Sequence, residues 1–405
     1  MIKRIEKSEA DGIVNAPGSK SAAHRLLICA AMCQGVSRID NLSLCEDVLA
    51  TIDCLRALGV NIELDGKTAT VRGVDFTKAE PKEPLNCRES GSTLRFLIPV
   101  AMLSGKEVSF IGTRKLLSRP MGVYEKLARK YGLTFKKEDD RITVCGPLVA
   151  GEYFIDGGVS SQFITGMLLA LSCLGGDSKI IVNRQVESRP YVDLTMSIMR
   201  EMGVRVHLDT DWSFLIFGGQ EYRAGDRRVE GDWSAGAFLE ALNGLSSSGL
   251  VTVNGLDENS VQGDKICREH LAALEQGYTE IDLSDCPDLG PILFTMAAIK
   301  GGARFVGTKR LRDKESDRIA AMQTELGKFG AELVVEENAV TVLCRELHAP
   351  SERLCGHNDH RIVMSLAVIC TLYGGEIEGC EAVSKSYPDF FEDIKVLGIK
   401  VYDVK

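Results

Sequence analysis

The 405-residue sequence predicts an α/β protein of two similar domains, each built from three related units. Two observations predict this organisation. An amphipathic helix, followed by a glycine and one or two alternating strands, recurs six times along the chain. Six further helices, rich in Ala, Leu and Met, are apolar on nearly every side, which places them in domain interiors.

Each amphipathic helix is expected to end at a glycine. In "TIDCLRALGVNIELDG", Gly59 follows the helix, and alternating apolar residues then indicate a strand. Helix–glycine–strand junctions occur in any α/β protein, but six nearly even copies favour a repeat. The copy at Gly277 is the weakest. The six glycines, mostly about 70 residues apart, are Gly59, Gly132, Gly203, Gly277, Gly330 and Gly398.

Composition and charge limit the classes of function. With 44% hydrophobic and 26% charged residues, the chain can build substantial cores. A formal net charge of -9 argues against bulk attraction to nucleic acid or to an acidic membrane. Thirteen cysteines without a C-x-x-C pair suggest buried thiols in a reducing compartment. The N-terminus lacks a signal-peptide core and "IVMSLAVICTLYGG" is too short to span a bilayer, so we expect a cytoplasmic protein.

The starts of the six apolar helices carry polar and basic residues. They read "GSKS", "RESGST", "GGVSS", "GDWSAG", "DCPDLG" and "NDH". If the helices of a domain run parallel, these ends converge on one face, and two such faces form a cleft. Because a helix N-terminus carries partial positive charge and unpaired N–H groups, the predicted cleft favours anions.

Several of these motifs have an ordinary structural explanation when taken singly. In "PGSKS", Lys20 precedes a helix on which Ser21 and Arg25 share a face, but a capped helix with a solvated lysine explains this as well. The spacing is not that of a phosphate-binding Walker A loop. "GGVSSQF" suits a phosphate or an ordinary cap, and "SRPMG" and "SRPY" hold an arginine beside a rigid proline.

The C-terminal half is more specific. "RLRDKESDRIAAM" could be a solvated charge run, although Lys314 and Arg318 fall together on a helix. "NDHRIVM" is harder to explain as surface, because Asp359, His360 and Arg361 precede a fully apolar helix and burying unpaired ions is costly. These groups should therefore face anionic ligands or paired carboxylates.

Together, the basic residues at the helix starts and in the turn of "SKSYPDFF" predict a cleft for two small, multiply charged anions. Asp288 and Glu315, held among cations, are suited to proton transfer. No His, Cys and Asp cluster has the spacing of metal ligands, so no metal is expected. The candidate cations are Lys20, Arg25, Arg119, Lys314, Arg318, Arg361 and Lys385.

Seven motifs in order closely resemble the 5-enolpyruvylshikimate-3-phosphate synthase family. They are "PGSKS", "GGVSSQF", "SRPY", "DCPDLG", "DKESDR", "NDHR" and "SKSYPDFF". The resemblance implies two domains, each of three βαβαββ repeats around buried parallel helices, an inside-out α/β barrel. It implies chain crossings near residues 14–19 and 225–231, so that 1–14 and 231–405 form one domain, 15–230 the other, and the active-site cleft lies between them.

The resemblance also implies an activity. Enzymes of this family transfer the enolpyruvyl group of phosphoenolpyruvate to the 5-hydroxyl of shikimate 3-phosphate and release phosphate, by addition and then elimination, in chorismate and aromatic amino-acid biosynthesis. No cofactor is implied, and we expect a monomer whose partners are these two small molecules.

Site residues are carried over motif by motif. Asp288 matches the carboxylate that receives the hydroxyl proton, Glu315 matches the acid/base near the methylene carbon, and Lys20 matches the lysine touching both substrates. The residues matching shikimate 3-phosphate contacts are Lys20, Ser21, Arg25, Ser160, Ser161, Gln162, Ser188, Tyr191, Asp288 and Lys314. Those matching phosphoenolpyruvate contacts are Lys20, Gly91, Arg119, Gln162, Arg318, Arg361 and Lys385.

The chain departs from the family pattern at Glu89, Ser90 and Arg310, and the response to glyphosate, which occupies the phosphoenolpyruvate site in this family, stays open. One alternative is the sister enolpyruvyl transferase acting on UDP-N-acetylglucosamine. It carries a cysteine before its Arg-Pro motif that "GTRKLLSRPMG" lacks, and "KESDR" also favours the shikimate enzyme. Another is a non-catalytic binder of phosphorylated metabolites, against which the intact carboxylates argue. His24 has no assigned role.

Overall fold

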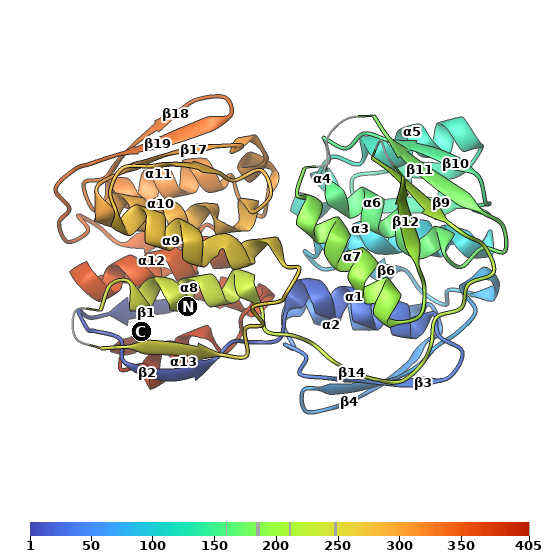
Figure 1. Cartoon of the computed structure of the whole chain (residues 1–405), viewed down its shortest axis with the longest axis horizontal. Coiled ribbons are helices and arrows are strands. Elements are labelled where there is room, and N and C mark those ends of the chain that lie inside the picture. The colour runs from blue at the N-terminus through green and yellow to red at the C-terminus, as the bar shows by residue number, and fades with distance from the viewer. Residues whose placement is uncertain (159, 184–186, 210–211, 247–248, 405) are drawn as a thin grey trace. The chain divides into compact units, whose positions relative to one another are not determined.

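A computed structural model of the chain describes residues 1–158, 160–183, 187–209, 212–246 and 249–404. Its contacts divide the chain into unit 1, Met1–Ser19 with Gly231–Lys405, and unit 2, Lys20–Glu230. Both are coloured along the chain in Figure 1. The first boundary lies a few residues later than the sequence suggests, because the Ala16 N–H donates to the Asn254 carbonyl of unit 1 at 2.8 Å.

Within the described residues, unit 2 contains three four-stranded sheets that share one strand order. In each, the first two strands run parallel and the last two form an antiparallel hairpin, as expected for a βαβαββ repeat. The orders are β14 (Asp226–Arg228), β3 (Val36–Asp40), β5 (Thr68–Arg72), β4 (Asn61–Asp65); then β6 (Leu85–Asn86), β7 (Glu107–Ile111), β9 (Arg141–Cys145), β8 (Thr134–Lys137); and β10 (Glu152–Ile155), β11 (Ser178–Val182), β13 (Ser213–Ile216), β12 (Val206–Asp209).

Unit 1 repeats this pattern twice and then shortens it. The fourth copy, around Gly277, lacks the hairpin in the described part of the chain. The strand before its helix pairs with only one other strand, and the strand after Gly277 already belongs to the next four-stranded sheet, which agrees with the weak sequence match. The N-terminal strand β1 completes a sheet with C-terminal strands. The sheets are β16 (Glu280–Asp282), β17 (Ala303–Val306), β19 (Ala339–Leu343), β18 (Glu332–Val335); β20 (Leu354–Cys355), β21 (Gly375–Glu378), β1 (Ile2–Ile5), β22 (Val401–Val404); and β15 (Val251–Asn254) with β2 (Gly12–Asn15).

Near each chain connection, one strand pairs with a repeat that is distant in the sequence. Strand β2 precedes the first crossing but pairs in parallel with β15 of its own unit. Strand β14 precedes the second crossing and pairs in parallel with β3 of unit 2. Each unit therefore completes a repeat with a strand from a distant part of the sequence.

The amphipathic helices end where the glycines predict. All six glycines have positive φ, from +70° at Gly132 to +119° at Gly277, a conformation that other residues rarely adopt. The helices are α2 (Glu46–Ala57), α5 (Gly122–Tyr131), α7 (Arg189–Glu201), α9 (Cys267–Glu275), α11 (Arg318–Gly327) and α13 (Phe390–Val396).

The apolar helices form the interior of each unit, as predicted (Figure 1). Nearly every residue of α12 is buried, and Leu27, Leu97 and Leu168 are fully inaccessible in unit 2. Gly166 brings α6 against α3, since a Cβ there would lie 2.5 Å from the Arg95 carbonyl. The helices are α1 (Lys20–Ala31), α3 (Gly91–Ala101), α6 (Ser161–Leu171), α8 (Trp233–Asn243), α10 (Gly290–Lys300) and α12 (His360–Tyr373).

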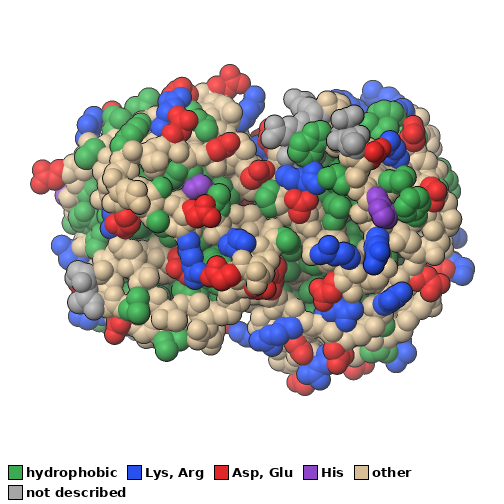
Figure 2. All heavy atoms as spheres, viewed as in Figure 1, with side chains coloured by type: hydrophobic (Ala, Val, Ile, Leu, Met, Phe, Trp, Pro, Cys, Tyr) green, Lys and Arg blue, Asp and Glu red, His purple; other side chains and the backbone are tan. Residues whose placement is uncertain are grey.

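Helix length, the state of the cysteines and the surface charges relate to the expected cellular environment of the chain. No helix in the described ranges is both long and apolar enough to cross a membrane. All thirteen cysteines, each in a described stretch, are free thiols, and burial raises the pKa of Cys45 to about 12. On the face shown in Figure 2, basic and acidic side chains are interspersed over both units.

Candidate active site

In unit 2, the start of α1 carries the first group of predicted residues. Lys20 opens the helix, and its Nζ lies 2.8 Å from Oδ2 of Asp47 in the first turn of α2. One turn later, buried Arg25 donates to the carbonyls of Ser21 (2.7 Å) and Tyr191 (3.0 Å), so α1 and α7 are tied together. Burial lowers the pKa of Arg25 to about 10. The guanidinium is nevertheless a cation at neutral pH.

The start of α3 forms the second group. A Cβ at Gly91 would lie 2.7 Å from Nη1 of Arg119, so this position leaves no room for a side chain. The same hypothetical Cβ would lie 3.4 Å from Nη1 of Arg95, which donates to Oε1 of Gln162 at 2.6 Å. Gln162 Nε2 in turn donates to the Ser92 hydroxyl at 3.0 Å, which fixes its amide orientation. Gly91, Arg119 and Gln162 are thus brought together.

Three predicted serines lie at helix starts of the same unit. Ser160 is the N-cap of α6, and its hydroxyl accepts the Gln162 N–H at 3.3 Å. Ser161 is the first residue of α6, and Ser188 is the N-cap of α7 with φ of +56°. All three are buried. The starts of α6 and α7 therefore offer hydroxyls and backbone N–H groups, as an anion site requires.

His24 now has a structural place. Its Nδ1 lies 2.6 Å from the Thr51 hydroxyl, which lies 2.7 Å from that of Thr93. Thr93 donates to Ser90, the N-cap of α3, at 2.7 Å. Burial lowers the pKa of His24 far below its usual range, and the charge of Lys20 lowers it further. A neutral imidazole therefore links α1, α2 and α3 beside the predicted ligands.

In unit 1, Asp288 is the centre of the predicted residues. It lies in the 3₁₀ turn η4 (Pro287–Leu289), directly before α10. Its Oδ1 accepts from Nζ of Lys314 at 3.1 Å and from Nη1 of Arg318 at 2.9 Å. Its Oδ2 accepts from Nη2 of Arg361 at 3.0 Å. Three cations from two segments of the chain thus surround one carboxylate, whereas the sequence predicted these residues only as a set of charges.

Arg318 connects the rest of this cluster. It is 1% exposed, and besides Asp288 it donates to Glu315 at 2.8 Å and to Asp359 at 2.9 Å. Burial alone would lower its pKa, but the surrounding carboxylates, Asp359 most strongly, raise it. Burial also lowers the pKa of Lys314, against the opposing charge of Asp288. The positive and negative charges of this buried cluster are therefore nearly balanced.

Lys385 lies beside the loop that leads into α12. Its Nζ donates to the Asn358 carbonyl at 2.7 Å. Asn358 and His357 both have positive φ, and His357 Nε2 lies 2.8 Å from Oε1 of buried Glu325. This contact supports the turn after which Asp359 caps α12 by accepting the Arg361 N–H at 3.0 Å.

Asp264, in η3 (Gly263–Ile266), is a buried carboxyl that the sequence did not single out. Burial, followed by the charge of Asp288, raises its pKa from 3.8 to about 6, with Arg361 opposing. Because the folded state holds this proton more tightly than the unfolded state, the carboxyl costs stability progressively as the pH rises from 3.8 to about 6, and the full cost is present above that pH.

We therefore expect the difference in unfolding free energy between Asp264→Asn and wild type to shift in favour of the variant from about pH 4 to about pH 7.5. The expected shift is on the order of 2 kcal/mol. Urea unfolding of both proteins at each pH measures this difference. A difference that is the same at both pH values would show that Asp264 titrates normally.

Sequence reasoning missed three charged members of the two clusters. Arg95 stands alone in the apolar stretch "STLRFLIPVAML", one turn after Gly91, and that isolated charge was the available signal. Asp47, the partner of Lys20, lies in a different helix, and no local pattern identifies it. Asp264 is likewise recognised only through its neighbours in space. Arg88, which directly precedes Glu89, contacts Glu46 and Asp53.

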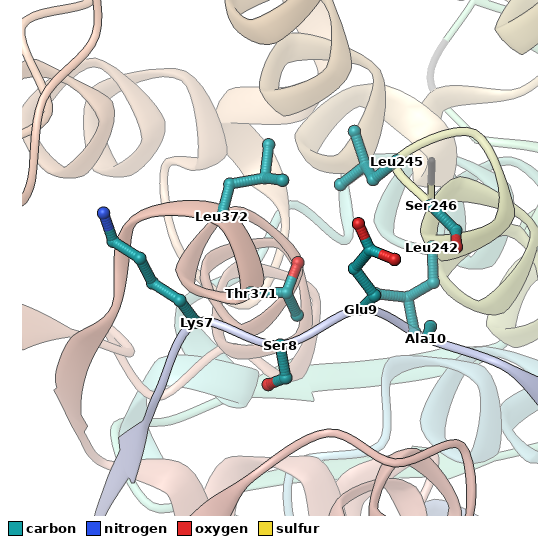
Figure 3. Close-up of a pocket in the computed structure, with 9 residues that line it drawn as sticks. All are labelled: Lys7, Ser8, Glu9, Ala10, Leu242, Leu245, Ser246, Thr371 and Leu372. Atoms are coloured by element: carbon teal, nitrogen blue, oxygen red, sulfur yellow. The ribbon is translucent and has the colours of Figure 1, made fainter. Parts of the chain in front are cut away.

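A cavity of about 300 Å³ lies elsewhere in unit 1 (Figure 3). Its walls include Ser8 and Ala10 after β1, Leu242 near the end of α8, and Thr371 near the end of α12. The candidate residue Arg361 lies at the opposite, N-terminal end of α12. Since α12 has 14 residues, about 21 Å separate its two ends, and the cavity is not part of the cluster. In the described residues no group of His, Cys, Asp and Glu is arranged to hold a metal ion.

Solved structures define the class of fold. The EPSP synthase of Acinetobacter baumannii superposes with a TM-score of 0.80 at 23% identity, over 99% of this chain and all of that one. The enolpyruvyl transferase NikO of Streptomyces tendae gives a TM-score of 0.77 at 15% identity, over 99% of this chain and 98% of that one. The chain has the fold of the enolpyruvyl transferases.

Sequence comparison narrows the class. Residues 5–394 match the family model of EPSP synthase, 3-phosphoshikimate 1-carboxyvinyltransferase. The 3-phosphoshikimate 1-carboxyvinyltransferase of Clostridium kluyveri is 38% identical, over 97% of this chain and 96% of that protein. The chain therefore belongs to the EPSP synthase family of transferases.

Proposed function

We propose that the chain transfers the enolpyruvyl group of phosphoenolpyruvate to the 5-hydroxyl of shikimate 3-phosphate and releases phosphate. The observation that carries this proposal is the grouping of Asp288, Lys314, Arg318 and Arg361, with Glu315 on Arg318. It combines cations for a phosphate and a carboxylate with carboxylates for proton transfer. Membership in the family supports the same reaction.

Shikimate 3-phosphate is assigned chiefly to unit 2. Ser160, Ser161 and Ser188 offer hydroxyls and helix N-termini to its phosphate, which carries two negative charges near neutral pH. Lys20 and Arg25 add full charges at the start of α1. Ser21 and Tyr191 hold the backbone carbonyls that orient Arg25, so they support this part of the site.

Phosphoenolpyruvate is assigned to cations of both units. Gly91 leaves space beside Arg119 and Arg95, where any side chain would collide with a guanidinium. Gln162, held by Arg95, presents its amide close by. Arg318, Arg361 and Lys385 supply the remaining charges from unit 1. Such donors stabilise phosphate as a leaving group because they meet the negative charge that develops on it.

Two carboxylates of unit 1 are assigned the proton transfers. Asp288 accepts the proton of the 5-hydroxyl, which makes that oxygen a better nucleophile, and Lys314 holds this carboxylate in place. Glu315 protonates the methylene carbon of phosphoenolpyruvate, which makes the adjacent carbon electrophilic, and Arg318 orients it at 2.8 Å. In the elimination step, Glu315 takes a methyl proton back as the bond between carbon and the phosphate oxygen breaks, and the proton held by Asp288 passes to the departing phosphate. Lys20 contacts both substrates.

The location, oligomeric state, pathway and partners of the chain complete the proposal. We propose that the chain acts as a cytoplasmic monomer in aromatic amino-acid biosynthesis, with these two metabolites as its partners. A non-catalytic binder is the alternative class of function, and the test below includes it.

Phosphate release from the purified chain tests the proposal. We expect phosphate only when phosphoenolpyruvate and shikimate 3-phosphate are both present, and none with either alone. Release with UDP-N-acetylglucosamine in place of shikimate 3-phosphate would assign the sister activity instead. Binding of both substrates by calorimetry without phosphate release would identify a non-catalytic binder.

A further inference from the structure

The two connections between the units leave unit 1 from one place. Gly18, shortly before the first crossing, forms an antiparallel bridge with Gly231, which directly follows the second. The Asp232 N–H donates to the Pro17 carbonyl at 2.8 Å, and the Gly231 N–H donates to the Gly255 carbonyl at 3.2 Å. Backbone contacts therefore hold the two crossing segments side by side.

One buried side chain bonds both segments at once. Oε1 of Gln262 accepts the Ser19 hydroxyl at 3.1 Å and the Trp233 N–H at 3.2 Å. Nε2 of Gln262 donates to the Gly231 carbonyl at 2.8 Å. Gln262 is 8% exposed and Ser19 is fully buried. A single amide thus contacts the last residue before the first crossing and two residues just after the second.

The residues held in this way lead directly to the proposed site. Ser19 is bonded covalently to Lys20, the first residue of α1 and of unit 2. Trp233 opens α8, and Asp232 caps that helix by accepting the Ala235 N–H at 2.9 Å. The position of the Gln262 amide therefore limits the direction in which Lys20 leaves unit 1.

We propose that Gln262 is a positioning residue, a clamp on both crossing segments that sets how Lys20 is presented to the substrates. This inference rests on the proposed function through the role of Lys20. The clamp requires a neutral amide, because one group must accept two hydrogen bonds and donate a third. A glutamate side chain lacks the N–H donor. A methionine side chain, similar in length, lacks both the N–H donor and the carbonyl acceptor of the amide.

Gln220 provides a matched control in unit 2. Its Oε1 accepts the Arg205 N–H at 2.8 Å, and its Nε2 donates to the carbonyls of Arg205 (3.0 Å) and Phe217 (2.9 Å). This amide also makes three hydrogen bonds, in this case all to backbone groups, but it bonds neither crossing segment. Gln262→Met and Gln220→Met therefore remove the same number of bonds with different expected consequences.

Two measurements on the full-length chain test the clamp. Hydrogen–deuterium exchange should be faster in Gln262→Met across residues 16–20 and 231–235, and unchanged there in Gln220→Met. In steady-state assays, kcat/KM should fall about tenfold to a hundredfold in Gln262→Met, since small misplacements of a substrate-contacting group cost this much. Gln262→Glu, which keeps the acceptor, should lie between wild type and Gln262→Met, and Gln220→Met should match wild type.

Unchanged exchange in the crossing segments would overturn the clamp. So would a loss of stability in Gln262→Met with kcat and KM at wild-type values, because the amide would then be merely structural. Absence of phosphate release from the wild-type chain would instead contradict the proposed function. The exchange experiment needs no activity, so the two failures can be told apart.

Discussion

Replacing Asp288 by asparagine should lower kcat about a thousandfold, within the range that positioned general bases contribute. The proposed role of Asp288 is to accept the 5-hydroxyl proton, and an asparagine of the same shape cannot do this. The variant also places a neutral amide among Lys314, Arg318 and Arg361, whose N–H groups need an acceptor. We therefore expect a lower free energy of unfolding of unit 1 as well as a lower kcat.

Initial rates of phosphate release, together with substrate binding by calorimetry, separate these two effects. Asp403→Asn is the matched control, because Asp403 also pairs with a lysine, Lys3, at 2.7 Å, but lies exposed on β22. Its kcat should equal that of wild type. If Asp288→Asn kept kcat within about twofold of wild type, another group would have to receive the proton.

Replacing Arg318 by methionine should destabilise unit 1 by about 3 to 5 kcal/mol, the usual cost of removing one partner from a buried ionic group. Three carboxylates share this guanidinium, and Asp359 is 0% exposed. Burial raises the pKa of Asp359, but the charge and hydrogen bond of Arg318, together with His360, lower it below its usual value. That stabilisation is present above the unfolded pKa of aspartate and is lost as the pH falls, so the deficit of the variant should shrink in acid.

Urea unfolding followed by the fluorescence of Trp233 measures this prediction. The chain has two tryptophans, and a Trp212→Phe background leaves only Trp233, fully buried in α8 of unit 1. Arg345→Met is the control, since Nε and Nη2 of Arg345 both donate to Oε2 of Glu332 at an exposed position, where such pairs contribute under about 1 kcal/mol. Equal stability losses in the two variants would show that Arg318 is not the electrostatic centre of the cluster.

Much of the fold could be predicted because its signals are local. A helix that ends at Gly59 and a strand that alternates after it are specified within about 20 residues, and the weak fourth copy did lose its hairpin. The strand exchange of β2 and β14 could not be predicted from the residues alone. It depends on pairings between segments more than 180 residues apart, which no periodicity encodes.

The site was predictable to the extent that its residues occupy helix starts. Lys20, Gly91 and Arg361 lie there because apolar helices bury everything after their first turn. The carboxylate partners were harder to identify, because Asp47 and Asp264 acquire their importance only from neighbours in space. Arg95 is hard to identify from the sequence because it is a single charge within an apolar helix and belongs to no motif.

The fate of the three carbons of phosphoenolpyruvate tests the central proposal most directly. We would incubate the chain with shikimate 3-phosphate and carbon-13-labelled phosphoenolpyruvate and follow the label by NMR. We expect the label to appear in an enolpyruvyl ether at the 5-oxygen of shikimate 3-phosphate, with one phosphate released per ether formed. Recovery of the label only as pyruvate, or as unchanged phosphoenolpyruvate, would contradict it.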